Sequence, residues 1–355
     1  MHALKRYPIR KNELLQAWDS ADELILKTLH EMDLAEKRIL IINDHFGALS
    51  DGLKVLRPTV FTDSYVSSQG IKFNLQEKII PINQLEDFSG IYDLVIIKIP
   101  KNLSFFEDIL CHLTHHLNSN SKVICGVMVK HLASSSFELI QKYIGVTTTS
   151  LTQKKARLIF ANFEKTSVTS QYPISVKLDG FEKDFIHHSN LFSREKLDIG
   201  TRFLLEKMPQ GEFERILDLG CANGVIGIKA KMLMPGAQII FSDDSAMAIS
   251  SARRNYQNYF ADQAEFYWTN CYENKEKNSV DLILCNPPFH QSNTIGDFIA
   301  LQMFDDAWEA LRPGGLLRVI GNSHLSYQFK LKKIFGNSKI VATNNKFMII
   351  DSIKK

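Results

Sequence analysis

The chain has 355 residues, of which 45% are hydrophobic and 23% are charged, and its formal net charge at pH 7 is +3. This length suggests about two domains, and the near balance of charges excludes binding of nucleic acid through a strongly basic tail. The five cysteines form no Cys-x-x-Cys pair, which favours reduced thiols in a cytoplasmic protein over disulfides or a metal site. No apolar run reaches the roughly 18 residues of a membrane-spanning helix, so we expect neither export nor membrane insertion.

A distant internal repeat divides the chain. Five segments of the first half resemble five segments of the second half, in the same order and at nearly constant spacing: 38–50 with 215–227, 61–74 with 241–255, 92–101 with 280–289, 137–145 with 328–336, and 154–160 with 344–350. One such match could arise by chance, but five in order predict two copies of one domain. We place the copies at 1–170 and 171–355, with the join in the polar segment SVTSQYP.

The elements of the second copy alternate between short apolar runs and amphipathic stretches. The predicted strands are RILDL (215–219), QIIFS (238–242), EFYW (265–268), DLILC (281–285) and LLRVI (316–320). This alternation is typical of βαβ units on a mostly parallel sheet, so we predict an α/β, doubly wound, Rossmann-like domain. The last segment, KIVATNNKFMIID, has two β-rich runs separated by a short polar turn, which predicts an antiparallel hairpin at the sheet edge.

A glycine-rich turn follows the first strand of the second copy, in ILDLGCANGVIG. Gly220 and Gly224 would let the backbone approach a ligand closely, because a side chain there would block it. Asp243 follows Asp218 by 25 residues and ends the next strand, where a carboxylate can accept hydrogen bonds from both hydroxyls of a ribose. Asn270 follows the third strand and would line an adenine pocket. Together these residues predict a ligand that contains a nucleoside, whereas the turn alone fits a purely structural role equally well.

The order of residues in the turn separates two classes of nucleotide cofactor. Dinucleotide-binding proteins use G-x-G-x-x-G to hold a pyrophosphate at a helix N-terminus. Here the order is D-x-G-x-x-x-G, beginning with Asp218 inside the strand. A carboxylate there would repel pyrophosphate but suits an ammonium or a sulfonium, and S-adenosylmethionine carries both. The segment resembles motif I of class I S-adenosylmethionine methyltransferases, although Ala222 stands where a third glycine is common, so we expect a slightly altered loop.

The fourth strand ends in Asn-Pro-Pro-Phe, residues 286–289. Proline fixes its backbone and donates no hydrogen bond, so the turn is stiff and rich in acceptors. The side-chain oxygen of Asn286 and the carbonyl of Pro287 can both accept from one planar amino group and orient its lone pair. Phe289 offers a face on which a base can stack, worth about 1–3 kcal/mol. The turn therefore predicts methylation of a planar amine, with a structural turn around a buried phenylalanine as the alternative.

This motif resembles that of methyltransferases that modify planar amino groups. The segment NLFSREKLDIGTRFLLEKM (190–208) and the two-domain plan resemble the rRNA guanine-(2-amino) methyltransferases. More narrowly, five segments resemble the large-subunit branch of that family, over about residues 13–351: LQAWDSADELIL, NDHFGALS, KKARLIF, NPPFHQ and the terminal FGNSKIVATNNKF. Phe192, Asp198 and Gly200 of the first segment either cover the methionine end of the cofactor or simply pack.

The resemblance implies S-adenosylmethionine as methyl donor and a flipped guanine of 23S rRNA as substrate. It also implies which residues act: Asn286, Pro287 and Phe289 would be catalytic, and Asp218, Gly220, Gly224 and Asp243 would bind the cofactor. We expect a monomer, because an internal repeat already forms a pseudo-dimer, and we expect no metal. Which guanine is modified, and whether the RNA is naked or in an assembling particle, does not follow from the sequence.

The first copy lacks the groups that carry the chemistry. Ile41 replaces the strand carboxylate, Asn43 replaces the first loop glycine, and Lys98 replaces the asparagine of the Asn-Pro-Pro-Phe turn. A cation cannot accept a hydrogen bond from an amino group. We therefore expect the first copy to bind no cofactor, to support the second copy and to help hold RNA, with Lys98 available to face a phosphate.

Other functions stay open at this point. The small-subunit relative, methyltransferase C, shares the domain plan, so N2 methylation of a guanine in 16S rRNA is one alternative. Methylation of a glutamine amide in a release factor is another, although those enzymes carry NPPY and a helical N-terminal domain in place of a repeat. Adenine-modifying DNA methyltransferases share the motif but usually add a target-recognition domain. A non-enzymatic RNA scaffold would require the second copy to be inactive too.

Overall fold

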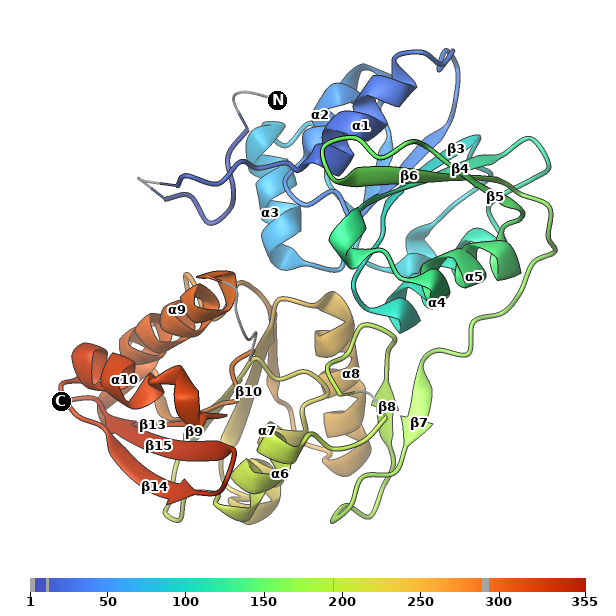
Figure 1. Cartoon of the computed structure of the whole chain (residues 1–355). Helices are drawn as coiled ribbons and strands as arrows, with labels where there is room; N and C mark the ends of the chain where they lie inside the picture. Colours follow the sequence, from blue (N-terminus) through green and yellow to red (C-terminus); the bar gives the residue numbers. More distant parts are fainter. Residues whose placement is uncertain (1–3, 11–12, 194, 289–293) are drawn as a thin grey trace. The chain divides into compact units, whose positions relative to one another are not determined.

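The structure is a computed structural model of the chain, and it describes residues 4–10, 13–193, 195–288 and 294–355. The chain divides into two compact units, Met1–Tyr172 and Pro173–Lys355, and each unit is built on its own mixed sheet with helices on both faces (Figure 1). Among the helices of the described residues, none combines the length and apolar composition needed to cross a membrane.

The first unit contains a six-stranded sheet of order β2-β1-β3-β4-β6-β5, in which β1 to β4 are parallel and β5 and β6 are antiparallel to their neighbours. Its strands are β1 (Ile39–Ile42), β2 (Thr59–Phe61), β3 (Leu94–Lys98), β4 (Lys122–Met128), β5 (Thr147–Thr149) and β6 (Ala156–Asn162). Its α-helices are α1 (Ser20–Leu29), α2 (Ala48–Gly52), α3 (Tyr65–Asn74), α4 (Leu103–Leu113) and α5 (Ser134–Tyr143).

The second unit contains a seven-stranded sheet of order β11-β10-β9-β12-β13-β15-β14, preceded by a small hairpin of β7 and β8. Its strands are β7 (Ile174–Val176), β8 (Phe185–His187), β9 (Arg215–Leu219), β10 (Gln238–Asp243), β11 (Glu265–Trp268), β12 (Val280–Cys285), β13 (Leu311–Asn322), β14 (Lys339–Thr343) and β15 (Phe347–Ile353). Its helices are α6 (Ile199–Glu206), α7 (Val225–Leu233), α8 (Ala246–Tyr259), α9 (Thr294–Ala310) and α10 (Tyr327–Phe335).

The two sheets follow one plan. Strands β2, β1, β3, β4, β6 and β5 of the first unit occur in the same order as β10, β9, β12, β13, β15 and β14 of the second, which adds β11 at one edge. All five predicted strands of the second copy are present, and β14 pairs antiparallel with β15 at the opposite edge, as the hairpin prediction requires. The prediction of two tandem doubly wound α/β domains is therefore confirmed.

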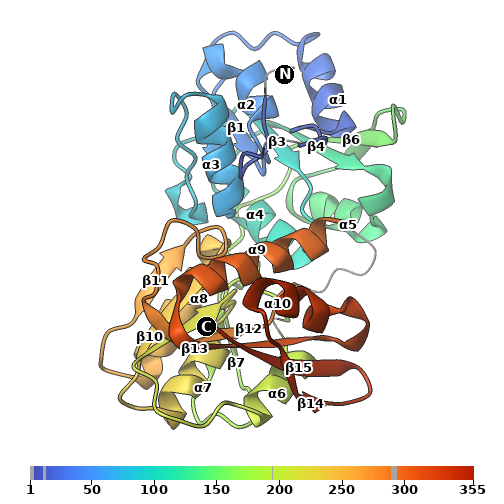
Figure 2. The ribbon, with the colours of Figure 1, turned by 90° about the vertical axis from the view of Figure 1, so that its left-hand side faces the viewer.

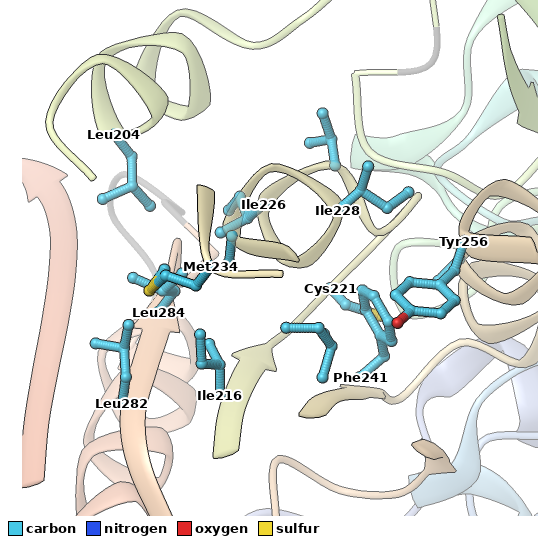
Figure 3. Close-up of a cluster of buried hydrophobic side chains, with 14 of the residues drawn as sticks. Leu204, Ile216, Cys221, Ile226, Ile228, Met234, Phe241, Tyr256, Leu282 and Leu284 are labelled. Atoms are coloured by element: carbon cyan, nitrogen blue, oxygen red, sulfur yellow. The ribbon is translucent and has the colours of Figure 1, made fainter. Parts of the chain in front are cut away.

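Helices cover both faces of the second sheet, which explains why its central strands are apolar on both sides. On one face, α6, α7 and α8 pack on side chains such as Ile216, Phe241 and Leu284 (Figure 3). On the other face, α9 and α10 pack on the side chains of the alternate strand positions (Figure 2). Ile216 to Leu219 of β9 are all completely buried. Asp218 lies within this run, and burying its carboxylate costs free energy of folding unless a hydrogen-bond or ionic partner compensates.

Candidate active site

The carboxyl ends of the parallel strands β9, β10 and β12 lie at one edge of the second sheet. Leu219, the last residue of β9, is level with Ser242 of β10 and with Cys285 of β12. The glycine-rich turn after β9, the end of β10 and the Asn-Pro-Pro-Phe turn after β12 are therefore brought together. In open parallel sheets this edge is where ligands bind.

Asp218 presents one unpaired carboxylate oxygen at this edge. Its Oδ2 accepts a hydrogen bond of 2.8 Å from the backbone N–H of Gly227 in α7, whereas Oδ1 has no hydrogen-bond partner within the described residues. Burial raises the pKa of Asp218 to about 8 against the effect of the Gly227 hydrogen bond, and the nearby charge of Asp243 adds to the rise. A positively charged ligand group beside Oδ1 would favour the ionised form and satisfy the atom.

Three more buried polar atoms lack a partner within the described part of the chain, and all three lie near the same edge. They are Ser242 Oγ in β10, Asn286 Oδ1 after β12 and Asn322 Oδ1 at the end of β13. An unsatisfied buried polar group costs about 1–3 kcal/mol, so such a cluster marks an edge built to receive a ligand. A further such atom in this unit, Nε of Arg215, lies at the opposite end of β9.

Sequence reasoning missed Ser242 and Asn322. The signal was present, because each stands near the end of an apolar strand, in QIIFSD and LLRVIGN. A polar residue that ends a buried parallel strand faces the ligand-binding edge, and this rule alone would have added both to the candidate site.

The backbone conformation of the turn, and the packing around it, favour glycine at both positions 220 and 224. Gly220 has φ +76°, and a Cβ there would meet only the flexible end of Met303, at 3.0 Å. Gly224 has φ +81°, and its Cβ would lie 3.1 Å from the backbone of Ala252 in α8. Gly47, at the matching position of the first unit, has φ +91°. The turn and its packing on α8 thus require glycine at 224 with or without a ligand, and cofactor contact by either glycine stays a prediction.

Ala222 adopts the left-handed conformation, with φ +48°, although it carries a side chain. Its backbone N–H donates to Oδ2 of Asp243 at 2.9 Å, and Oδ1 of Asp243 accepts from the N–H of Ser245 at 2.9 Å. Asp243 therefore ties the glycine-rich turn to the end of β10. Burial raises the pKa of Asp243, and these backbone hydrogen bonds oppose the rise. The backbone N–H of Asp244 donates to the same carboxylate, and the lone pairs that these three donors leave are available to the ribose of a ligand.

Asn270, which follows β11, is buried, and its amide donates to Oε2 of Glu273 at 3.0 Å. The backbone N–H of the preceding residue, Thr269, donates to the carbonyl of Asp243 at 3.0 Å. Trp268 is paired with Asp243, the last residue of β10, so Asn270 lies two residues beyond that level, which is compatible with the predicted adenine pocket. Its contact with a ligand stays a prediction.

The Asn-Pro-Pro-Phe turn places an oriented amide at the ligand edge. The Nδ2 of Asn286 donates to Oγ1 of Thr201 in α6 at 2.8 Å, which leaves Oδ1 as the free acceptor described above. Pro287 is buried next to it. Phe289, the predicted stacking residue, lies outside the described residues. Thr201 was not among the residues predicted from the sequence.

In the first unit, the corresponding edge is closed by that unit's own side chains. Lys98, at the end of β3, is only 5% exposed, and its Nζ lies 2.7 Å from the carboxylates of both Asp19 and Asp22. Asn43, in the turn after β1, donates from Nδ2 to the carbonyl of Lys98 at 3.2 Å. Burial lowers the pKa of Lys98, but the two carboxylates outweigh it and leave the pKa above its usual value. The prediction that Lys98 faces a phosphate is therefore wrong.

Another acid takes over the place of the missing strand carboxylate in this unit. Oδ2 of Asp44 accepts from the backbone N–H of Ser50 at 2.8 Å, and Ser50 aligns with Gly227, the residue that donates to Asp218 in the second unit. Asp44 also accepts from the Ser50 hydroxyl at 2.7 Å. Both oxygens of Asp44 are engaged, since Oδ1 accepts from the N–H of Gly47 at 3.2 Å. The first unit has thus kept its helix N-terminus capped, and both carboxylate oxygens of Asp44 already accept hydrogen bonds within the unit.

Replacing Lys98 with methionine is expected to destabilise the first unit by about 3–5 kcal/mol, because it leaves the buried carboxylate of Asp22 and the partly exposed carboxylate of Asp19 without their cation. Urea unfolding of the full chain, with hydrogen exchange of peptides from β3 to locate the loss, measures the effect. Lys54→Met is the matched control: the Lys54–Asp51 pair lies at the surface, with the lysine side chain 57% exposed, so its loss should cost less than about 1 kcal/mol. Equal losses in the two variants would contradict the structural role of Lys98.

The described part of the chain contains no group of three or more histidine, cysteine or acidic side chains that could hold a metal ion.

Two family models match the chain: the RLMG N-terminal domain over residues 1–165 and the methyltransferase small domain over residues 182–351. Among solved structures, the 16S rRNA N2 methyltransferase RsmC of T. thermophilus, in complex with AdoMet and guanosine, is similar over 100% of this chain and 98% of that one, with a TM-score of 0.84. At 20% identity, this likeness shows the fold.

Curated relatives carry the comparison further. The ribosomal RNA large subunit methyltransferase G of Psychromonas ingrahamii is 42% identical, with 99% of this chain and 96% of the relative covered. The protein of the same name from Photobacterium profundum is 45% identical, with the same shares covered. The family resemblance predicted from the sequence motifs is thereby confirmed. With this level of identity along almost its whole length, the chain belongs to the ribosomal RNA large subunit methyltransferase G family.

Proposed function

We propose that the protein transfers a methyl group from S-adenosylmethionine to the exocyclic 2-amino group of one guanine in 23S rRNA. The observation that carries the proposal is the buried Oδ1 of Asn286, which has no partner among the described residues and lies at the ligand edge of a methyltransferase fold. Two features support the substrate: the family is named for the large-subunit rRNA, and a protein of the same fold is a 16S rRNA N2 methyltransferase solved with guanosine. The catalytic unit is 171–355.

The residues at the edge of the second sheet fit the methyl donor. S-adenosylmethionine supplies an electrophilic methyl group on a positively charged sulfur. Asp218 would hold the positive charge of the ligand with Oδ1, the buried atom that has no other partner in the described chain. Asp243 would accept from the ribose hydroxyls with its remaining lone pairs, and Gly220 would leave the backbone accessible. Asn270 would line the adenine pocket.

The Asn-Pro-Pro-Phe turn would prepare the amine. The lone pair of the guanine 2-amino group is delocalised into the base, which makes the amine a poor nucleophile. Asn286 Oδ1 and the Pro287 carbonyl would accept its two N–H bonds and turn the lone pair toward the donor. No strong base is required beforehand, since the proton can leave after transfer. Phe289 would stack on the flipped base, because a base within a duplex is out of reach of such a site.

The first unit, placed at 1–170, would support the catalytic unit and help to hold the RNA. At its edge Lys98 is paired with Asp19 and Asp22, and Asn43 donates to the carbonyl of Lys98, which favours a supporting role over a second catalytic centre. The protein would act as a monomer in the cytoplasm, where ribosomes assemble, on free 23S rRNA or on an assembly intermediate. Electrostatic binding to RNA phosphates should weaken steeply with salt. Equal RNA affinity of a variant lacking the first unit would contradict its RNA-holding role.

Mass-spectrometric mapping of rRNA from cells that lack the protein tests the function. The expected result is the loss of one N2-methylguanine from 23S rRNA, and its return when the purified enzyme and S-adenosylmethionine are added. Loss of an N2-methylguanine from 16S rRNA alone would show that the substrate is the small-subunit rRNA. An unchanged rRNA together with an unmethylated glutamine in a release factor would replace the proposal by protein methylation.

A further inference from the structure

We propose that Thr201 is a positioning residue that holds the amide of Asn286 with its oxygen toward the target amine. The inference rests on the proposed function, since it concerns how the acceptor for the guanine amino group is oriented. The amide of asparagine has two ends of nearly equal size but opposite hydrogen-bonding character. Only the oxygen end can accept from an amino group, so something must fix which end faces the substrate.

The hydrogen bonds around Asn286 supply that direction. Its Nδ2 donates to Oγ1 of Thr201 at 2.8 Å. The Thr201 hydroxyl itself lies 3.4 Å from Oδ2 of Asp198, to which it donates its single proton. Because that proton is directed at a carboxylate, the hydroxyl meets Asn286 as an acceptor. The opposite orientation would bring the amide oxygen against a hydroxyl lone pair and turn the amide N–H groups toward the substrate.

Thr201 is itself held rigidly. It is the third residue of α6, it is 6% exposed, and its backbone N–H donates to Oδ2 of Asp198 at 2.9 Å. Asp198 is the N-cap residue of that helix. The cap that starts α6 thus also fixes the hydroxyl, and through it the amide. This gives Asp198 a role at the target amine, distinct from covering the methionine end of the cofactor.

The first unit has an ion pair at the position where the second unit has the Thr201–Asn286 hydrogen bond. This equivalence is independent support for a role of that contact. Asp19 is the N-cap of α1 and Asp22 is its third helical residue in a capping box. Asp22 lies 2.7 Å from Lys98, the counterpart of the asparagine after β12. In the first unit, the third residue of α1 contacts Lys98, which ends β3. In the second unit, the third residue of α6 contacts Asn286, which follows β12. Both partners have changed, and the contact has been kept.

Replacing Thr201 with valine removes the hydroxyl and keeps the side-chain shape. The amide of Asn286 is then free to turn over, so that in part of the molecules two N–H groups face the amino group of the substrate. We expect kcat to fall by about 10–100-fold, because misorientation of a reacting group costs rates of this order. The KM for RNA and the S-adenosylmethionine affinity should each change by less than about threefold, since the Thr201 hydroxyl is engaged by Asn286 and Asp198 and would act on the substrate only through Asn286. Thr201→Ser, which keeps the hydroxyl, should restore kcat to within about threefold of the original.

A second background separates orientation from packing. Asn286→Asp presents two equivalent oxygens, so either orientation offers an acceptor to the amine. In this background, Thr201→Val should lower kcat by less than about twofold. Single-turnover transfer of a radiolabelled methyl group to 23S rRNA follows even slow variants, and calorimetry with S-adenosylmethionine shows that each variant is folded. An equal loss from Thr201→Val in both backgrounds, or full activity of Thr201→Val, would overturn the inference. If the unaltered protein did not methylate 23S rRNA, the proposed function would fail instead.

Discussion

Asn286→Ala is expected to lower the rate of methyl transfer to 23S rRNA by about 10²–10³-fold, by analogy with deletion of one oriented hydrogen-bonding group from an active site. The reason is local. Asn286 carries a buried oxygen that no described residue engages, and its amide is held at the end of β12, beyond the residues that would contact the nucleoside of the cofactor. Single-turnover kinetics measures the rate, and calorimetry measures the affinity for S-adenosylmethionine, which should stay within about twofold.

Asn258→Ala is the matched control in the same unit. The amide of Asn258 donates to the carbonyl of Asp184 at 3.4 Å at an exposed position on α8, so its removal should leave transfer unchanged. A loss of cofactor affinity in Asn286→Ala as large as the loss of rate would show that Asn286 belongs to the cofactor pocket. Loss of activity in both variants would point to a general effect on folding.

One S-adenosylmethionine is expected to bind per chain, in the second unit, with the first unit weaker by roughly 10²–10⁴. Each lost charge-assisted contact is worth about 1.5–3 kcal/mol, and the first unit lacks both the free carboxylate oxygen and the open turn. Ile41 stands in the place of Asp218, and the side chain of Asn43 spans from the turn to the carbonyl of Lys98. Calorimetric titration of the full chain should give a stoichiometry near one.

The same titration of Asp218→Ala locates the site. Binding should be lost almost completely, because the only other copy of the pocket is closed. A stoichiometry near two for the unaltered protein, or strong binding that survives in Asp218→Ala, would overturn the assignment of the second unit as the active one. Asp44→Ala, which removes the acid that accepts from the Ser50 N–H in the first unit, should leave the stoichiometry and affinity unchanged while it uncaps the start of α2.

Cofactor affinity is also expected to depend on pH through Asp218. In the unliganded protein burial raises its pKa to about 8, so at neutral pH this carboxyl is largely protonated. A cationic ligand favours the ionised form, and binding therefore releases a proton below about pH 8. By linkage, affinity should fall as the pH is lowered from 8 and level off above it. Titrations at pH 6.5 and 8.5 measure this, and Asp218→Asn, which cannot ionise, should lose the dependence.

Local patterns in the sequence were enough to predict most of the fold. The apolar run around Asp218, the spacing to Asp243 and the prolines after Asn286 each report on a single strand and its end, and strand ends meet at one edge by topology alone. The hairpin of β14 and β15 follows in the same way from two β-rich runs and a short turn.

Contacts between distant residues could not be predicted in this way. The sequence analysis treated Lys98 as available to RNA. Its two partners lie 79 and 76 residues earlier in the chain, so no local pattern around Lys98 indicates that two carboxylates pair with it. Thr201 was missed for the same reason, since it lies 85 residues from Asn286. The position of Asn322 near the end of an apolar strand is visible in the sequence, but the missing hydrogen-bond partner of its Oδ1 depends on the packing around it. Such facts depend on the packing of α1 and α6, which sequence periodicity does not determine.

The unpaired polar atoms at the ends of β9, β10, β12 and β13 also affect how the two halves survive in the cell. These atoms lower the free energy of unfolding of the catalytic half, and a bound ligand that supplies hydrogen-bond partners restores part of it. A ligand at a hundred times its dissociation constant adds about 2.7 kcal/mol to the stability of the unit that holds it. The first half, whose lysine is already neutralised by its own carboxylates, gains nothing. When the methyl donor becomes scarce, susceptibility to proteolysis should therefore rise in the catalytic half alone.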